Sequence, residues 1–287
     1  MMKRMGISLL LLIAACAVLG ATGQTYQETL RPSDDGEIIV RSDAPQVTIE
    51  RHSDSQDVLV DLSGPGKDRY RLTVRKDGGD VFVEVKKKRG VFIGLRSFLD
   101  ARLTVSIPRQ WEGSVLSVST VSGALQVKEP VSGRSVYLKS VSGAINFDTI
   151  RTTREASVET VSGAIRGHLV EAGELDLSSV SGAIQVDSIT ETGNGKALVE
   201  TVSGSIRIGR TEGDSFKLGS VSGAIQVALP ARFAGVVTTS SISGSTSADF
   251  ASEHTASSDK RTQRHTVGSG TDSMEVGTTS GSIRITR

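Results

Sequence analysis

Few side chains in this sequence have the types and spacing that catalysis or metal binding requires. The histidines are scattered, and none has the spacing of a zinc ligand set; they are His52, His168, His254 and His265. The segment 257–260 (SSDK) matches the S-x-x-K start of a penicillin-binding signature, but no S-D-N or K-T-G accompanies it. The sequence also lacks a G-x-S-x-G elbow, a P-loop and a dinucleotide-binding fingerprint. We therefore expect no catalytic residue, no cofactor, no metal and no enzyme activity.

A polysaccharide-processing enzyme would need clustered carboxylates on one face. The polar positions that follow the repeated motif described below contain no acid; they are Gln126, Asn146, Arg166, Gln185, Arg207, Gln226 and Arg284. Asp148 and Asp187 come later, in repeats that are not neighbours. No acidic pair therefore supports this class of enzyme, which we keep as an alternative.

The charge balance and composition of the 287 residues exclude other classes of protein. The 33 Lys and Arg residues nearly equal the 32 Asp and Glu residues, whereas a dedicated nucleic-acid binder has a clear basic excess. A single cysteine excludes an intramolecular disulfide framework. Few aromatics with many glycines suit thin β-structure better than a large globular core.

The first 23 residues have the pattern of a secretory signal peptide. Lys3 and Arg4 precede an apolar run over 7–19, which is too short to span a bilayer as a helix, and small residues precede Gln24. The segment 13–16 (IAAC) is similar to a bacterial lipobox, which would make Cys16 a lipidation site. We expect export to the periplasm, the cell surface or the medium, either after cleavage before Gln24 or with a lipid anchor on Cys16.

The dominant signal is an internal repeat of Val-Ser-Gly-Ala or a close variant. Its glycines are Gly123, Gly143, Gly163, Gly182, Gly204, Gly223, Gly244 and Gly281. Seven copies keep a period near 20 residues, and the last follows an insertion. Apolar and polar residues alternate on both sides of each copy, which predicts two short strands per repeat.

The inward-facing set changes phase across the motif. It falls on even numbers at Val136 and Leu138 but on odd numbers at Ile145 and Phe147. A straight strand cannot do this, so the motif must be a corner, and the glycines are expected to supply the positive φ that it needs. The sequence thus predicts an all-β fold, a right-handed single-stranded β-helix (β-solenoid) with about 20 residues per coil.

A Ser or Thr precedes each motif and should stack into a ladder; its members are Thr120, Ser140, Thr160, Ser179, Thr201, Ser220, Ser241 and Thr278. If these side chains point inward, their hydroxyls must pair with one another or with backbone groups of the corner.

The rest of the mature chain divides into a cap, the repeats and an insertion. Residues 24–110 alternate without the motif and are expected to form an N-terminal β cap with irregular first coils. Residues 111–287 form the repeat solenoid, which a long polar insertion at 249–272 interrupts. The insertion either folds over the last strand, at 282–287, or is a solvated loop.

One segment of the cap combines charge and apolar side chains. Residues 86–99 hold a basic tetrad beside two phenylalanines; the residues are Lys86, Lys87, Lys88, Arg89, Phe92 and Phe98. This segment either plugs the open end of the solenoid or contacts an anionic membrane or a partner.

The serial S-G-x-I corners, and the segment 103–108 (LTVSIP) leading into 116–120 (LSVST), resemble a bacterial family, the putative-adhesin family of unknown function. The likeness covers residues 36–287. It implies a β-helix exported to the cell envelope or surface, with no established enzyme activity. Many relatives have Asp after the corner glycine where this chain has Ala or Ser, so its corners are less charged.

Our leading hypothesis is an adhesin-like, non-enzymatic envelope or surface protein whose rigid solenoid face binds an envelope protein or a glycan. The resemblance also permits a regulator of envelope stress. Nucleic acid is not an expected partner, and membrane contact is expected only through a lipid on Cys16 or through residues 86–99. If the strand edges at the solenoid ends are unpaired, chains can also associate end to end.

Overall fold

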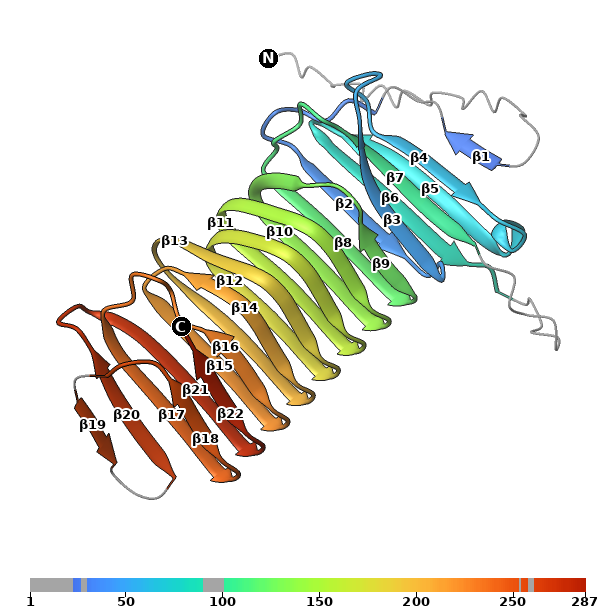
Figure 1. Ribbon diagram of the computed structural model, residues 1–287. Coiled ribbons are helices and arrows are strands. Elements are labelled where there is room, and N and C mark those ends of the chain that lie inside the picture. Colours follow the sequence, from blue (N-terminus) through green and yellow to red (C-terminus); the bar gives the residue numbers. More distant parts are fainter. Residues whose placement is uncertain (1–22, 27–29, 90–100, 253, 258–260) are drawn as a thin grey trace, which may run out of the picture.

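The computed structural model describes residues 23–26, 30–89, 101–252, 254–257 and 261–287. In this part of the chain 22 strands form one continuous hydrogen-bonded system, and most neighbouring strands are parallel. The chain winds into a rod of stacked coils (Figure 1), which is a β-solenoid. The 3-10 turn η1 (Lys67–Arg69) lies between strands of the N-terminal region.

Two long faces meet at the corner motif. The strands before the corner form the first face, in the order β5 (Tyr70–Asp77), β6 (Asp80–Lys87), β2 (Glu37–Ser42), β8 (Val115–Ser122), β10 (Val131–Ser142), β11 (Ile145–Ser162), β12 (Ile165–Ser181), β13 (Ile184–Ser203), β15 (Ser215–Ser222), β21 (Asp272–Ser280), β17 (Gly235–Ser243), β20 (Thr262–Val267) and β19 (His254–Ser257).

The strands after the corner form the second face. Their order is β1 (Gly23–Tyr26), β4 (Leu59–Ser63), β7 (Arg102–Pro108), β3 (Gln46–His52), β9 (Ala124–Val127), then the first residues of β11, β12 and β13, then β14 (Ile206–Glu212), β16 (Ile225–Ala228), β22 (Ile283–Thr286) and β18 (Thr246–Asp249). The strands β11, β12 and β13 each continue from one coil into the next and so contribute to both faces.

The predicted phase change across the corner is confirmed. Val136 and Leu138 are fully buried before the corner, and Ile145 and Phe147 are buried after it. Equivalent residues stack coil upon coil in register, as Leu138 does on Val158. The core is therefore a set of parallel columns of β-branched and aliphatic side chains that run along the rod.

The coil order at the C-terminal end departs from the order of the sequence. Strands β21 and β22 follow β17 and β18 in the chain, yet they lie between them and the coil of β15 and β16 (Figure 1). The amide of Ile225 donates to the carbonyl of Ser282, and the amide of Ile283 donates to Ser245. Of the two alternatives for the 249–272 insertion, the one in which it covers residues 282–287 is wrong, because β22 is already paired on both edges. Strand β20 of the insertion instead pairs antiparallel with β17.

The N-terminal end has the same arrangement. The coil of β2 and β3 comes first in the chain, but it lies between the coil of β6 and β7 and the coil of β8 and β9. Beyond it, β5 and β4 pair antiparallel with β6 and β7. Antiparallel strands thus close the first face at both ends, and the second face at the N-terminal end.

Candidate contact surface

The corner glycines allow the coils to approach closely. A Cβ atom added to Gly182 would overlap the carbonyl oxygen of Gly163 in the neighbouring coil, and one added to Gly204 would overlap that of Gly182. Each of the other motif glycines is in the same position against its neighbour, with Pro45 as the neighbour of Gly123; they are Gly123, Gly143, Gly163, Gly223, Gly244 and Gly281. Any side chain at these positions would therefore force the coils apart.

The predicted reason for these glycines is wrong at seven of the eight positions. Only Gly123 has a positive φ, at 150°, so the other corners do not need left-handed backbone. The glycines are required by the distance between stacked corners rather than by backbone conformation.

The Ser/Thr ladder holds the stacked corners together. The hydroxyl of Thr201 donates a 3.1 Å hydrogen bond to the carbonyl of Gly182, and Ser220 bonds Gly204 at 3.1 Å. Equivalent bonds join Thr160 to Gly143, Ser179 to Gly163, Ser241 to Gly281 and Thr278 to Gly223. These side chains are buried, so the bonds satisfy polar groups that water cannot reach. Of the two options raised by the sequence, bonding to corner backbone is found at these six positions, whereas the hydroxyls of Thr120 and Ser140 have no hydrogen-bond partner in the described structure.

This corner turns the first residue of the motif outward. The exposed residues form one row along the rod, which we call the valine ridge; its members are Val121, Val141, Val161, Val180, Val202, Val221 and Ile242. These residues are 47–58% exposed, and among the described residues no other large hydrophobic residue is exposed. In the remaining two stacked corners the equivalent residues are Asp43, beside Val121, and Thr279, between Val221 and Ile242.

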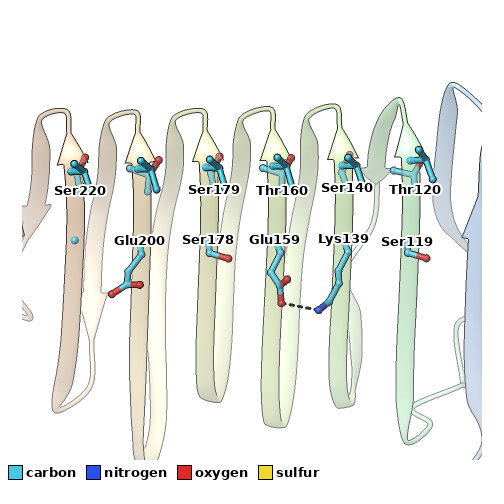
Figure 2. Close-up of a pocket in the computed structure, with 18 of the residues that line it drawn as sticks. Ser119, Thr120, Lys139, Ser140, Glu159, Thr160, Ser178, Ser179, Glu200 and Ser220 are labelled. Atoms are coloured by element: carbon cyan, nitrogen blue, oxygen red, sulfur yellow. Dashed lines mark ion pairs between the residues drawn. The ribbon is translucent and has the colours of Figure 1, made fainter.

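A second outward row lies two residues before the ridge; we call it the flanking row. Its members, in coil order, are Arg41, Ser119, Lys139, Glu159, Ser178, Glu200, Gly219, Gly277 and Ser240. Figure 2 shows five of these residues beside the Ser/Thr ladder on successive coils; they are Ser119, Lys139, Glu159, Ser178 and Glu200. Together the two rows line a shallow groove of about 1030 Å³ that follows the rod.

The charges of the flanking row are unevenly distributed. Lys139 forms an ion pair of 2.9 Å with Glu159 (Figure 2), and Glu200 has no ion pair in the described structure. Burial acts to raise the pKa of Glu159, but hydrogen bonds from Lys139 and Ser157 outweigh it and lower the pKa. The row is therefore basic at Arg41 and Lys139 and acidic at Glu159 and Glu200.

Asp176 lies on the same outer face, next to this row. Desolvation raises its pKa, and the negative charges of Glu159, Glu200 and Glu155 raise it further. Its Oδ1 is buried without a hydrogen-bond partner in the described structure. Asp176 is thus an acid whose ionised form is poorly stabilised.

The described part of the basic segment 86–99 is residues 86–89, which end β6 and follow it on the corner side of the first face. Val85 pairs with Ser42 and Arg102 pairs with Gln46, the residues that flank corner residues 43–45 of the adjacent coil. Lys86 forms an ion pair of 2.8 Å with Glu84. The ammonium of Lys88 donates to the carbonyl of Asp68, and Lys87 and Arg89 are exposed. Phe92 and Phe98 lie outside the described residues, as does Cys16 of the N-terminal segment.

Three of the chemistry-bearing residues come together in a way that the sequence did not indicate. Asp148, His168 and Asp187 occupy equivalent positions of three successive coils, and His168 Nδ1 lies 3.1 Å from Asp187 Oδ2. The side chains of His168 and Asp187 are about two-thirds exposed. Across the described ranges, no group of three or more His, Cys, Asp or Glu residues is placed to hold a metal ion.

The other histidines lie apart. The ring of His52 contacts the carbonyl of Asp57 through Nε2, and buried His265 packs edge-on against Phe250. Burial lowers the pKa of His265. His254 begins β19, and part of the S-x-x-K segment lies outside the described residues.

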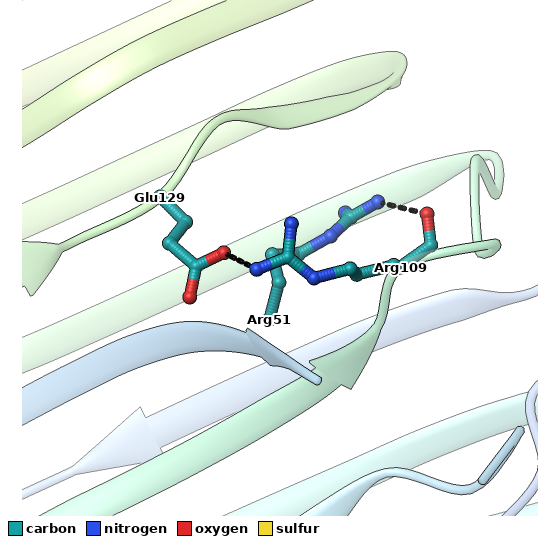
Figure 3. A network of polar contacts seen from close by, with 3 residues as sticks. All are labelled: Arg51, Arg109 and Glu129. Carbon is teal, nitrogen blue, oxygen red and sulfur yellow. Dashed lines mark hydrogen bonds and ion pairs between the residues drawn. The ribbon is translucent and has the colours of Figure 1, made fainter. Parts of the chain in front are cut away.

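A polar network anchors the chain where it leaves β7. Arg51 donates to the carbonyls of Arg109 (2.8 Å) and Trp111 (3.2 Å), and Arg109 pairs with Glu129 (Figure 3). Burial, and then the charge of Arg109, lower the pKa of Arg51. The bonds tie three chain segments together, so we assign this network a structural role.

The valine ridge is the feature that the sequence interpretation missed. The alternation rule identifies inward and outward residues within strands, but the ridge lies in the corner, where the rule does not apply. The available signal was the recurrence of a β-branched residue at a position that the fold leaves exposed.

Fold and corners define a parallel β-solenoid with stacked glycine corners. The chain belongs to the family described as Toastrack DUF4097, whose sequence model matches residues 36–286. This is a family of unknown function, and the predicted resemblance is confirmed. A search of curated proteins found no match.

Several solved structures are similar to the chain. A putative adhesin from Bacteroides fragilis is 12% identical with a TM-score of 0.48, and the match covers 93% of this chain and 98% of that one. A putative adhesin from Parabacteroides distasonis is 11% identical with a TM-score of 0.46, covering 92% and 96%. A putative lipid binding protein from the same organism is 15% identical with a TM-score of 0.36, covering 93% and 98%. Within the described residues, no helix is both long and apolar enough to span a membrane.

Proposed function

We propose that this chain is a non-enzymatic, exported protein of the bacterial envelope or surface that binds a protein partner through the valine ridge. Its rigid coils hold the ridge in a straight line, and the leader-like N-terminal sequence supports export. The observation that carries the proposal is the row of half-exposed β-branched side chains, one on each of seven coils.

The fold itself does not require apolar residues at the ridge. Asp43 and Thr279 occupy equivalent positions in two corners, and these corners stack like the others. A hydrophobic residue nonetheless recurs at the other seven positions, although an exposed apolar row favours association. Contact with a partner explains why hydrophobic residues recur at these corners, whereas the stability of the fold does not.

A protein surface fits the ridge better than a glycan does. The valine side chains offer shape and apolar area but no hydrogen-bond partner, whereas a sugar presents many hydroxyl groups. The residues that line the groove include no aromatic side chain on which a sugar ring could stack. An apolar strip on a protein is the complementary surface.

A photo-crosslinking amino acid at Val161, introduced into the full chain in bacterial cells, tests the proposal. We expect crosslinked protein at this position, much less at the exposed Gln185 on the other face, and loss of the Val161 product when Val141→Asp and Val202→Asp are added. Equal crosslinking at both positions would contradict a specific ridge contact. Ridge-dependent binding of a purified glycan would contradict a protein partner, and release of reducing ends would contradict a non-enzymatic role.

Export is measured on the same cells by the mass of the mature N-terminus. Cleavage before Gln24 or a lipid on Cys16 is the expected result. Uncleaved chain in the cytoplasm would contradict the proposed location.

A further inference from the structure

We propose that the partner of the valine ridge is a second copy of this chain, packed antiparallel about a two-fold axis between Val161 and Val180. This inference rests on the proposed function and names its partner. It follows from three properties of the ridge, which are its spacing, its sequence of polar and apolar positions, and the charges of the flanking row.

The spacing of the ridge selects the kind of partner. Stacked coils place one ridge residue every ~4.8 Å, because each step along the ridge is one hydrogen-bonded strand pair. A partner must keep the same interval to contact six valines in a row. Another β-solenoid has this interval by construction, and identical rows of side chains at this interval interdigitate in dry β-sheet contacts. A second copy is the simplest such partner.

Asp43 and Thr279, the two polar corner residues in line with the ridge, fix one antiparallel register. With the two-fold axis between Val161 and Val180, Val161 faces Val180 of the second copy, Val141 faces Val202, and Val121 faces Val221. The next position outward places Asp43 opposite Thr279. Six apolar residues then meet six apolar residues, and the two polar positions meet each other. A shift of one coil in either direction changes this match, because Asp43 or Thr279 would then face a valine.

The flanking row is complementary in the same register. An antiparallel pair with flank opposing flank places Lys139 opposite Glu200 of the second copy, and the symmetry repeats this contact. Glu159 faces Ser178, so no like charges oppose each other. Glu200 has no ion pair among the described residues, whereas the ammonium of Lys139 pairs with Glu159 and can donate to a second carboxylate. Opposite charges at matching positions favour this orientation over a parallel one.

The size of the contact predicts a weak, reversible dimer. Six coils span ~29 Å, and the ridge with its flanking row is about 14 Å wide, because alternate strand residues are ~6.8 Å apart. This gives about 400 Å² per chain, or about 800 Å² in total, which is below the range of stable complexes. Association is therefore expected to depend on concentration, and to be favoured where chains are crowded on a surface.

Disulfide crosslinking of the purified full chain, in a Cys16→Ser background, tests the register. A mixture of the Val141→Cys and Val202→Cys proteins should form a crosslinked dimer under mild oxidation. Val141→Cys alone should not, because its two cysteines would be three coils apart, about 14 Å, beyond the reach of a disulfide. Crosslinking of Val141→Cys alone would indicate a parallel pair and overturn the proposal. Failure of the mixture to exceed a Gln185→Cys control would also overturn it.

Sedimentation from about 1 µM to about 1 mM measures the affinity. Val180→Asp should raise the Kd at least ~100-fold, whereas Ile242→Asp, outside the six-valine overlap, should change it less than about 3-fold. Lys139→Glu and Glu200→Lys should each weaken the dimer about 10-fold, and combining them should recover most of the loss. A wild-type chain that stays monomeric to about 1 mM, or equal effects of Val180→Asp and Ile242→Asp, would overturn the proposal.

The two proposals fail in different ways. If the wild-type chain is monomeric and Val161 crosslinks to a different protein in cells, the second-copy proposal fails and the proposed function stands. If the purified chain forms the antiparallel dimer but Val161 and Gln185 crosslink equally in cells, the dimer stands and the proposed function fails.

Discussion

The hydroxyl of Thr160 donates a 3.2 Å hydrogen bond to the carbonyl oxygen of Gly143, the corner glycine of the neighbouring coil. The bond joins a buried side chain to a glycine that the corner of the next coil approaches closely, at Gly163. The same relationship recurs in the coils that follow. The hydroxyl of Thr120, which is equally buried, has no hydrogen-bond partner in the described structure. Two threonines in equivalent places thus differ in one bond.

This difference predicts opposite outcomes for one substitution at two sites. Thr160→Val should lower the free energy of unfolding by about 1 kcal/mol, because it removes a buried hydrogen bond and leaves a carbonyl with one partner fewer. Thr120→Val should be neutral or slightly stabilising, because it replaces an unbonded buried hydroxyl with a methyl group. Urea unfolding of both variants measures the two changes. Equal costs at the two positions would show that the ladder bond does not contribute.

The closeness of the stacked corners predicts a strong effect at Gly182. Gly182→Ala should destabilise the chain by several kcal/mol, about 3 or more, because the new methyl group overlaps the carbonyl of Gly163. Gly219→Ala is the matched control, because its Cβ would meet nothing closer than Glu200 at 3.7 Å. It should be tolerated or mildly stabilising. Thermal unfolding compares the two, and similar melting temperatures would contradict close approach as the reason for the corner glycines.

The environment of Asp176 predicts a pH-dependent effect of Asp176→Asn. The pKa of this acid is higher in the folded chain than in the unfolded chain, so the folded chain binds the proton more tightly. The stability that this proton contributes is present below about pH 4 and is lost as the pH rises through the folded pKa. The Asn variant should therefore gain stability relative to the wild type between pH 3.5 and pH 7.

Unfolding free energies at the two pH values measure this gain. Adding Glu200→Gln should reduce it, because Glu200 contributes to the raised pKa. An Asn effect that does not change with pH would contradict the raised pKa.

The position of the β21–β22 coil, between the coil of β15 and β16 and the coil of β17 and β18, predicts an unusual pattern of hydrogen exchange. Strand β22 is paired with β16 on one edge and with β18 on the other, whereas β18 is paired only with β22 in the described structure. Peptides that cover Ile283 and Ile285 should therefore exchange more slowly than those that cover Thr246–Asp249. Exchange followed by mass spectrometry compares both strands in one sample. Faster exchange in β22 would contradict its internal position.

The sequence predicts the repeating part of the fold well for a physical reason. Alternation at Val136, Leu138, Ile145 and Phe147 reports directly which side chains are buried, and its phase change requires a corner. The role of glycine is harder to predict. A residue that needs positive φ and one that needs close backbone contact are both glycine, and the sequence does not distinguish Gly123 from Gly143.

The coil order at the ends and the ridge are not predictable in the same way. Backbone hydrogen bonds between parallel coils are equivalent, so β16 could pair with β18 or β22, and the sequence pattern of both strands permits either. The outward position of Val161 depends on the corner geometry, which the stacking of Gly163 on Gly143 sets. Both features depend on contacts between segments rather than on the pattern within one segment.

Near each end of the rod, one coil lies between two others out of chain order: the coil of β2 and β3, and the coil of β21 and β22. This order restricts how the length of the rod can change through gene duplication. Between β10 and β15, each coil stacks on the one that precedes it in the chain, so a duplicated 20-residue unit would add one more coil without disturbing its neighbours. A duplication within 229–287 would instead disturb the pairing of β17 with β21, the strand that lies between β17 and β15. Natural variation in coil number should therefore be concentrated in the middle of the chain, and each added unit would bring one more residue to the valine ridge.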